Sequence, residues 1–167
     1  MSETAHVFIG YDHRETVAYH VLAHSILSRA TMPVAIHPIK SSLFKDFYER
    51  PRDARQSNDF SFTRFLVPHL MGHSGWALFM DCDMLMQADI RELWDLREAD
   101  KAVMVCQHDY MPRTGKKYLG NTQYAYPRKN WSSFMLMNCN NWSCHHLTPE
   151  YVASASGLAL HQFKWCP

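Results

Sequence analysis

Residues 75–85 (GWALFMDCDML) constrain the fold more than any other stretch, because an apolar run of strand length ends there in two carboxylates, Asp81 and Asp83. Side chains alternate across a strand, so these two acids would point the same way if the strand continued, and Cys82 would point elsewhere. Even in a tight turn both acids could reach one cation. Acids at the end of a buried strand are costly without a positive partner, and ligands bind at the carboxyl ends of strands in open α/β sheets. The pattern therefore predicts a divalent metal that carries phosphates.

Length and composition limit the classes of protein that fit. A chain of 167 residues is one ordinary domain that buries roughly 70% of its unfolded surface. The content of 47% apolar and 20% charged residues, with a net charge of +1, gives no reason to expect nucleic acid or an anionic membrane as a partner. No apolar run approaches the roughly 20 residues that a transmembrane helix needs. The oligomeric state stays open.

Cysteine usage and the N-terminus predict the compartment. The five cysteines form an odd number without a C-x-x-C pair, and residues 1–4 lack the basic and apolar regions of an export signal. We therefore expect free thiols and a cytoplasmic location.

Apolar runs of strand length alternate with segments of helical periodicity along the chain. The expected elements are strands over 6–10, 33–39, 75–81, 102–107 and 133–138, helices over 14–29, 42–48, 62–71 and 89–96, and a last helix that opens at Thr148-Pro149. This alternation predicts an α/β sandwich around a mostly parallel sheet, in one domain over 1–167. Tyr11 and Asp12 follow the first strand, so they too lie at a ligand-facing edge.

Two details refine the predicted helices. In the first helix Val17, Val21, Leu22 and Ile26 recur at helical spacing, which predicts that they face the sheet. Pro68 is expected to end or kink its helix.

Two helix starts carry capping signals. Asp89 and Glu92 fit a capping box, and the helix would run to Leu96. Thr148 and Pro149 are a favoured N-cap and first helical residue.

The order of four segments resembles family 8 glycosyltransferases of the GT-A fold. The segments are Tyr11-Asp12, 62–68 (FTRFLVP), 77–84 (ALFMDCDM) and 131–138 (WSSFMLMN), and the likeness covers most of the chain. The resemblance implies a GT-A sheet with helices on both faces. It also implies a glycosyltransferase of the hexosyltransferase type that uses a nucleotide-diphosphate sugar, usually a UDP-sugar, with Mn²⁺ or Mg²⁺ on the D-x-D. The sugar would pass to an unknown acceptor with retention of anomeric configuration.

The resemblance also assigns residues on the nucleotide side. Asp81 and Asp83 would hold the metal, with Cys82 between them in the donor site. Tyr11 and Asp12 would lie near the base and ribose.

Three further residues would complete the site. Arg64 would lie near the nucleotide or the D-x-D itself, and an ion pair with a buried acid is its alternative role. Trp131-Ser132-Ser133 matches the family's Asn-Ser-Gly at Ser132, which would contact sugar or acceptor. His161-Gln162 lies where the family has Asp-Gln, so Gln162 is a candidate near the anomeric carbon.

The sequence departs from the family in its last part. The family takes a third metal ligand, a His, and a Lys that contacts the diphosphate from a segment beyond the Asp-Gln region, and this sequence stops at Pro167. The sequence could be a fragment or truncated form, a His and a Lys from elsewhere in the chain could substitute for the missing residues, or the protein could have lost catalysis. We favour the first interpretation.

Cationic side chains would assist the reaction because negative charge builds on the leaving diphosphate. The segment 110–129 is expected to be a cationic loop, and its basic residues are Arg113, Lys116, Lys117, Arg128 and Lys129. Lys116 and Lys117 could act with Arg64, or simply form a solvated face.

Three alternatives compete with a metal-dependent transferase. A haloacid-dehalogenase-type phosphatase also carries D-x-D after an apolar strand, but normally in its first strand. A nucleotide-sugar-binding domain without turnover is the second alternative. Cys139, Cys144, His145 and His146 could be drawn as a zinc site with irregular spacing.

Overall fold

The computed structural model describes residues 3–53, 56–107, 127–128 and 130–166. Within these residues five strands form one sheet in the order β2-β1-β3-β5-β4. β1 pairs in parallel with β2 and β3, and β5 is antiparallel to both β3 and β4. Four strands therefore run the same way, and the expected α/β fold with a mostly parallel sheet is confirmed.

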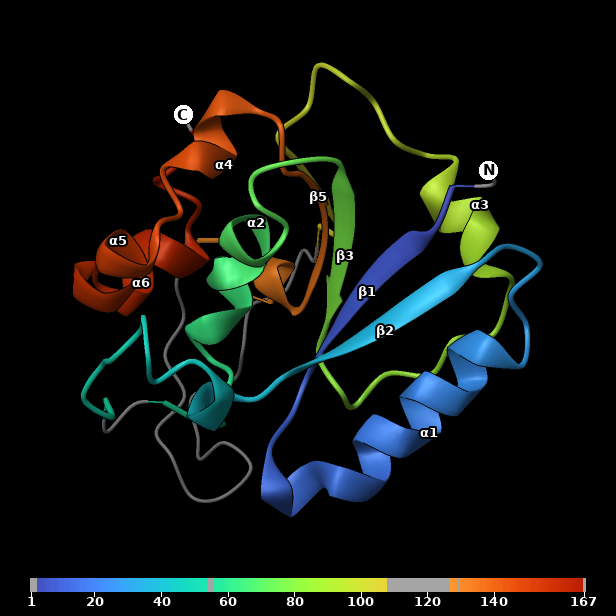
Figure 1. Cartoon of the computed structure of the whole chain (residues 1–167), viewed down its shortest axis with the longest axis horizontal. Helices are drawn as coiled ribbons and strands as arrows, with labels where there is room; N and C mark the ends of the chain where they lie inside the picture. Colours follow the sequence, from blue (N-terminus) through green and yellow to red (C-terminus); the bar gives the residue numbers. More distant parts are fainter. Residues whose placement is uncertain (1–2, 54–55, 108–126, 129, 167) are drawn as a thin grey trace.

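The strands are β1 (Ala5–Gly10), β2 (Val34–Ile39), β3 (Trp76–Met80), β4 (Val103–Val105) and β5 (Phe134–Asn138). The α-helices are α1 (Thr16–Leu27), α2 (Val67–Leu70), α3 (Ile90–Trp94), α4 (Trp142–His145), α5 (Pro149–Ser154) and α6 (Gly157–His161). Short 3₁₀ helices cover His13–Glu15, Ser41–Leu43, Thr63–Leu66 and Trp131–Ser133. In Figure 1, α1 and α3 are drawn to the right of β3, and α2, α4, α5 and α6 to its left.

The core lies along the three inner strands. β1, β3 and β5 are buried over nearly their whole length, whereas the edge strands β2 and β4 are mostly half-buried. Burial on both faces explains why the inner strands read as continuous apolar runs. Pro38 is tolerated because β2 pairs on one side only. Gly10 is needed at the end of β1, since a Cβ there would lie 2.3 Å from the Phe60 ring.

Strand direction brings three segments to one edge of the sheet. Ile9 pairs with Met80, so the residues after β1 and after β3 leave the sheet side by side. β5 runs the other way, with Met80 opposite Phe134, so the segment before β5 reaches the same edge. The Asp81 N–H donates to the Ser133 carbonyl at 2.8 Å. Tyr11-Asp12, the D-x-D and Trp131-Ser132-Ser133 therefore meet there. The sequence predicted a ligand-facing strand end for the first two, and the third arrives because β5 is antiparallel.

Two predictions about the first half of the chain are wrong. The helix expected over 42–48 is a 3₁₀ helix at Ser41–Leu43 and a single turn, in which the Tyr48 N–H reaches the Phe44 carbonyl at 2.8 Å. This single turn already buries the rings of Phe44 and Tyr48. A segment this short gains too little free energy from further helical hydrogen bonds to extend the helix. In α1, Leu22 and Ile26 are buried as expected, but Val17 is 78% and Val21 49% exposed.

The face of α1 that packs inward is different from the predicted one. Ala18, Ser25 and Ala23 accompany Leu22 and Ile26, and a rotation of about 100° per residue carries Val17 and Val21 away from that face.

Other helix boundaries follow their caps. Pro68 does not end α2 but is its second residue. In the first turn of a helix a residue needs no acceptor for its backbone N–H, so a proline is tolerated there. Asp89 caps α3 by accepting from the Arg91 N–H, although α3 ends at Trp94 rather than Leu96. Thr148 caps α5 as expected. The helices α4 and α6 were not predicted, and Asn141 and Ser156, which cap them, were the available signals.

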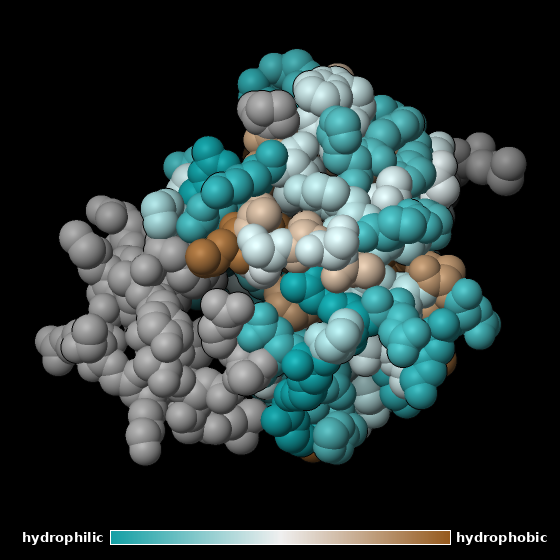
Figure 2. Space-filling view, turned by 90° about the vertical axis from the view of Figure 1, so that its left-hand side faces the viewer, coloured by the Kyte–Doolittle hydropathy of each residue, from teal (hydrophilic) through white to brown (hydrophobic). Residues whose placement is uncertain are grey.

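Among the described residues, none of the helices has the length and apolar character that a membrane span requires. Figure 2 views the side that is on the left in Figure 1, where most described residues are hydrophilic and hydrophobic ones gather in small areas.

Candidate functional site

The D-x-D lies in a turn directly after β3. Asp81 forms an ion pair with Arg64, in which Asp81 Oδ1 lies 2.8 Å from Arg64 Nη1. The side chain of Asp81 is 20% exposed. The Asp81 Oδ1 atom has no well-aligned hydrogen-bond donor, although the guanidinium is close. Asp83 is exposed and forms no ion pair with a described residue. Because the strand ends at Met80, the two acids do not follow strict strand alternation, and only Asp81 has a fixed partner.

Arg64 connects this turn to the segment before β5. Its side chain is 6% exposed, and Nη1 also donates to the Ser132 carbonyl at 2.8 Å. The guanidinium lies 5.0 Å from the centroid of the Phe79 ring, an arrangement that favours a cation. The sequence placed Arg64 near the nucleotide or the D-x-D, and its contact with Asp81 puts it at the D-x-D.

Ser132 is linked in turn to the end of α6. Its hydroxyl lies 2.7 Å from His161 Nδ1, and the Phe65 ring packs edge-on against the His161 ring with centroids 5.2 Å apart. Gln162 follows α6, and its main-chain carbonyl accepts from Arg128 Nη1 at 2.9 Å. The structure thus joins Asp81, Arg64, Ser132 and His161 in one connected chain of contacts. The roles of Ser132 and Gln162 toward sugar stay predictions.

Glu15 is an acid at this edge that the sequence reasoning missed. Its carboxylate lies 3.7 Å from the buried thiol of Cys82. Burial raises the pKa of Glu15, and the charges of Asp12 and Asp83 raise it further. Burial likewise raises the pKa of Cys82 to about 12, so the thiol stays protonated beside the acids. No short-range sequence signal connects Glu15 with Cys82, because the contact depends on how α1 leaves β1.

Among the residues that the structure describes, Asp81, Asp83 and Glu15 face Arg64 at this edge, and Arg14 is already paired with Asp12. Burial raises the pKa of Asp81 to about 6 against the opposing effect of Arg64, and Asp83 and Glu15 raise it further. Carboxylate oxygens in excess of local cations are the donor set that hard divalent cations prefer. The residues present therefore fit a metal of the Mn²⁺ or Mg²⁺ type at Asp81 and Asp83.

Asp12, in contrast, is saturated by the protein itself. Its buried carboxylate accepts from Arg14 Nε at 2.9 Å and Nη2 at 2.6 Å, from the Arg14 N–H, and from the Asp59 N–H at 3.0 Å. These bonds hold its pKa well below the usual range, with the Arg14 side chain as the largest cause. Tyr11 lies beside it, with its hydroxyl 3.3 Å from Thr16 Oγ1. Contacts of Tyr11 and Asp12 with a base or ribose stay predictions.

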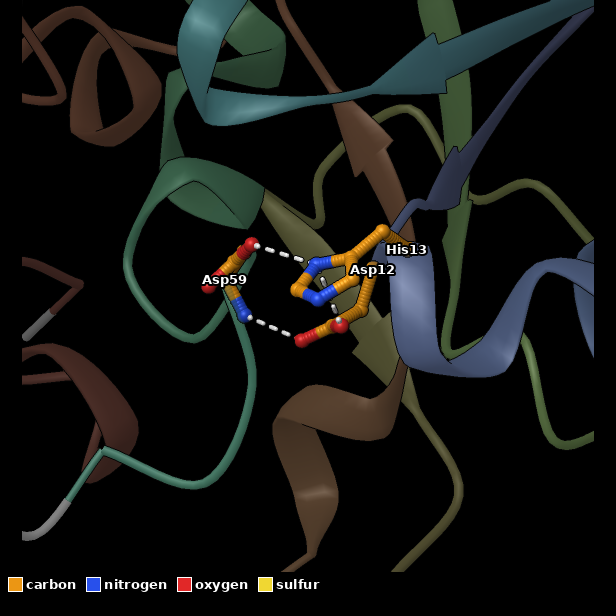
Figure 3. Close-up of side chains that lie close together, drawn as sticks. All are labelled: Asp12, His13 and Asp59. Carbon is orange, nitrogen blue, oxygen red and sulfur yellow. Dashed lines mark hydrogen bonds and ion pairs between the residues drawn. The ribbon is translucent and has the colours of Figure 1, made fainter.

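Asp12, His13 and Asp59 form a second possible metal site, and among the described residues they are the group whose ligand atoms lie within 4.8 Å of one another. Figure 3 shows the His13 ring between the two acids, with Nδ1 at 3.5 Å from Asp12 Oδ1 and 3.8 Å from Asp59 Oδ2. Asp12 is paired with Arg14, and Asp59 with Arg52 at 2.8 Å. Two arginines already balance the two acids, so a cation would have to displace them.

Acidification should reveal the charge of Asp12. A carboxyl whose folded pKa is lowered stabilises the fold above its unfolded pKa, and that stabilisation disappears as pH falls toward the folded pKa. We expect Asp12→Asn, which keeps a capping side chain, to cost on the order of 2 kcal/mol at pH 7 and less at pH 3, where only part of the stabilisation is lost because the folded-state pKa is lower still. Urea unfolding of both proteins at the two pH values measures this. An equal difference at pH 7 and pH 3 would contradict the ionic role.

Two other sequence hypotheses receive no support from the described residues. Cys139 and Cys144 are buried and direct their thiols to carbonyls of Met137 and Ala102, whereas His145 and His146 are exposed, so the drawn zinc site does not form. Of the cationic loop, Arg113, Lys116, Lys117 and Lys129 lie outside the described residues.

Comparisons with known proteins show the family and the fold of this chain. The family model "Glycosyl transferase family 8" matches residues 7–160. An Arabidopsis thaliana protein named "Protein CDI" is 48% identical over 161 residues, which cover 95% of this chain and 62% of that protein. The chain therefore spans less than two thirds of the length of this relative.

Two solved structures share the fold at low identity. The glycosyltransferase GlyE of Streptococcus pneumoniae TIGR4 matches with a TM-score of 0.55 and 13% identity over 86% of this chain and 36% of that chain. Mouse xyloside xylosyltransferase 1, in its apo form, matches with a TM-score of 0.52 and 16% identity over 97% of this chain and 77% of that chain. The family match removes the support for a haloacid-dehalogenase-type phosphatase. Because the family model covers most of the sequence, this chain belongs to glycosyl transferase family 8.

Proposed function

We propose that this chain carries the donor site of a glycosyltransferase that moves a sugar from a nucleotide-diphosphate sugar, of UDP type, to an acceptor with retention. The supporting observation is the group of carboxylates at the end of β3, Asp81, Asp83 and Glu15, in a chain of this family. Among the described residues Arg64 pairs with this group at Asp81, and Arg14 is already paired with Asp12. Such an edge fits a divalent cation, and through it a diphosphate.

Each residue of the edge has a defined task in this proposal. Asp81 and Asp83 would hold Mn²⁺ or Mg²⁺, which when bound would neutralise negative charge on the diphosphate. Arg64 acts on Asp81, because the ion pair and the bond to the Ser132 carbonyl fix the carboxylate and the strand ends relative to each other. Arg64 is therefore a positioning residue.

The sugar end of the site would be formed by Ser132 and Gln162. Ser132 is buried and its hydroxyl is fixed by His161, which orients the segment before β5 toward the same edge as Asp81. Gln162 comes next to His161, and the Arg128 guanidinium holds its carbonyl. A sugar placed between these segments and the metal would have its anomeric carbon near the diphosphate that leaves. The acceptor is unspecified.

A panel of nucleotides tests the proposal. We expect UDP and UDP-sugars to raise the thermal unfolding midpoint in the presence of Mn²⁺, and ADP and GDP to raise it less. Incubation with the matching UDP-sugar and Mn²⁺ should release UDP. Release of inorganic phosphate from phosphomonoesters, or no response to any nucleotide with Mn²⁺, would refute the assignment.

A domain that binds nucleotide sugar without turnover is the second candidate. The observation that favours it is His161, an imidazole held by Ser132 at the position where the resemblance expects an acid. Under this alternative Mn²⁺-dependent UDP binding persists, and no UDP is released from any UDP-sugar.

A further inference from the structure

The carboxylate of Asp12 is fully used by the protein, although it stands at the nucleotide end of the proposed donor site. It is completely buried, and two backbone N–H groups and two nitrogens of the Arg14 guanidinium donate to it at 2.6 to 3.0 Å. A carboxylate has about four acceptor positions. No position is left for a nucleotide, so the carboxylate of Asp12 instead fixes the segments that donate to it.

One of these segments is 57–60, which two bonds fasten to the end of β1. The Asp59 N–H donates to Asp12 at 3.0 Å. Arg14 Nη2, which also bonds to Asp12, donates to the Ser57 carbonyl at 3.2 Å. One guanidinium and one carboxylate therefore hold this segment, and the pair Asp12 and Arg14 is its clamp.

The clamped segment lies beside the D-x-D. The Phe60 ring packs on Gly10 of β1 and on the Phe79 ring of β3, with the two ring centroids 6.4 Å apart. The Phe60 carbonyl accepts from Arg64 Nε at 3.4 Å, and Arg64 pairs with Asp81. The segment 57–60 is therefore a fourth segment at the edge where the ends of β1 and β3 and the start of β5 meet.

Asp59 keeps oxygens that a ligand can reach. Its side chain is 31% exposed, and Oδ1 pairs with Arg52 at 2.8 Å. Oδ2 accepts no hydrogen bond from a described residue, and His13 Nδ1 lies 3.8 Å from it (Figure 3). Arg52 is itself 55% exposed, and an exposed ion pair of this kind is weak, so a ligand can compete for the carboxylate. Asp12 offers no such oxygen.

On the basis of the function proposed above, we propose that Asp59 is the carboxylate that recognises the uridine part of the donor, and that Asp12 and Arg14 are positioning residues that hold it in place. A carboxylate accepts hydrogen bonds and donates none, so Asp59 selects a donor group of uridine, either the uracil N3–H or a ribose hydroxyl. Cytosine has no N3–H, and a 2′,3′-dideoxyribose has neither hydroxyl.

Calorimetry in Mn²⁺ with UDP, CDP and 2′,3′-dideoxy-UDP tests the role of Asp59. We expect the parent to prefer UDP over at least one of the other two by about tenfold or more, because a hydrogen bond to a charged group contributes at least that factor. Asp59→Ala should lose this preference. Asp100→Ala removes another exposed ion pair, with Lys101, and should keep it.

Arg14→Met tests the clamp. The nitrogens of Arg14 bond to Asp12 and Ser57 rather than to a ligand, yet its loss should remove the same preference because Asp59 is no longer held. Arg14→Met combined with Asp59→Ala should lose no more than Asp59→Ala alone. A general defect in folding lowers the affinity for all three diphosphates by one factor, so it leaves the preference unchanged.

The outcomes separate this role from the proposed function. An unchanged preference in Asp59→Ala would overturn recognition by Asp59, while Mn²⁺-dependent UDP binding by the parent would still support the donor site. An unchanged preference in Arg14→Met would overturn the clamp. A parent that binds the three diphosphates equally would refute recognition by Asp59, and a parent that binds none of them would refute the proposed function as well.

Discussion

Replacing Asp81 and Asp83 by asparagine is expected to abolish the effect of Mn²⁺ on UDP binding. Asp81 and Asp83 are the two acids that the D-x-D contributes to the negatively charged edge, and asparagine removes both charges with little change in shape. An amide oxygen is a weak ligand beside a carboxylate, so the ion and the diphosphate that it carries lose their anchor. We expect at least a hundredfold loss of UDP affinity in Mn²⁺, measured by calorimetry with and without the metal.

The double variant should still fold. The asparagine at 81 keeps an oxygen that can accept from Arg64 Nη1, now 2.8 Å from the carboxylate. Burial and the nearby acids oppose the charge of Asp81, so its removal relieves repulsion in the metal-free protein. Far-UV circular dichroism should therefore match that of the parent.

A matched control removes two charges elsewhere. Asp95 and Asp100 are exposed and precede β4, which runs parallel to β3, so they lie toward the opposite edge of the sheet. Asp95→Asn with Asp100→Asn should leave Mn²⁺-dependent UDP binding unchanged. Equal UDP affinity in the parent and in the Asp81, Asp83 double variant would remove the D-x-D from the metal site.

The sheet and its edge could be predicted from the sequence because the signals are local. Continuous apolar runs mark the inner strands, and the carboxylates at 81 and 83 stand where one such run ends. The strand and carboxylate inferences require only neighbours along the chain and one rule about strand ends. Arg64 is placed near the D-x-D by the family resemblance, and its apolar neighbours add only that a buried ion pair with an acid is its alternative role.

The remaining contacts of the site depend on the fold itself. Glu15 meets Cys82, Asp59 meets Asp12 and His161 meets Ser132 across 67, 47 and 29 positions of sequence. No spacing rule predicts such pairs. The exposed Val17 and Val21 show the same limit for helices. Apolar residues at helical spacing share one face of the helix, but the spacing alone does not tell which of two adjacent apolar faces packs against the core.

Arg64→Met is expected to be the most destabilising change at the edge. Methionine fills most of the volume beside Phe60 and Phe79 but leaves the Asp81 carboxylate without its cation and the Ser132 carbonyl without a donor. Removing one partner of a mostly buried ion pair costs about 3 kcal/mol. Urea unfolding at pH 7.5 measures the free energy of unfolding, and Arg52→Met, whose ion pair with Asp59 is exposed, should cost about 1 kcal/mol or less.

The pH dependence of that loss identifies its cause. The pKa of Asp81 is raised to about 6 in the folded parent, above the usual 3.8, and loss of Arg64 should raise it further. A carboxyl with a raised folded pKa binds its proton more tightly in the folded state, so its destabilising effect grows as pH rises from the unfolded toward the folded pKa. Arg64→Met should therefore lose less stability at pH 5 than at pH 7.5.

A double-mutant cycle separates the ion pair from packing. If the unpaired carboxylate causes the loss, Arg64→Met combined with Asp81→Asn should be more stable at pH 7.5 than Arg64→Met alone, with a coupling energy of about 2 kcal/mol. If the cost lay in lost contacts of the guanidinium with Phe60 and Phe79, the second substitution would restore nothing and the loss would be the same at pH 5. Because Arg64 also holds the Ser132 carbonyl, incomplete recovery in the double variant measures what that bond contributes to joining β3 and β5 at the site.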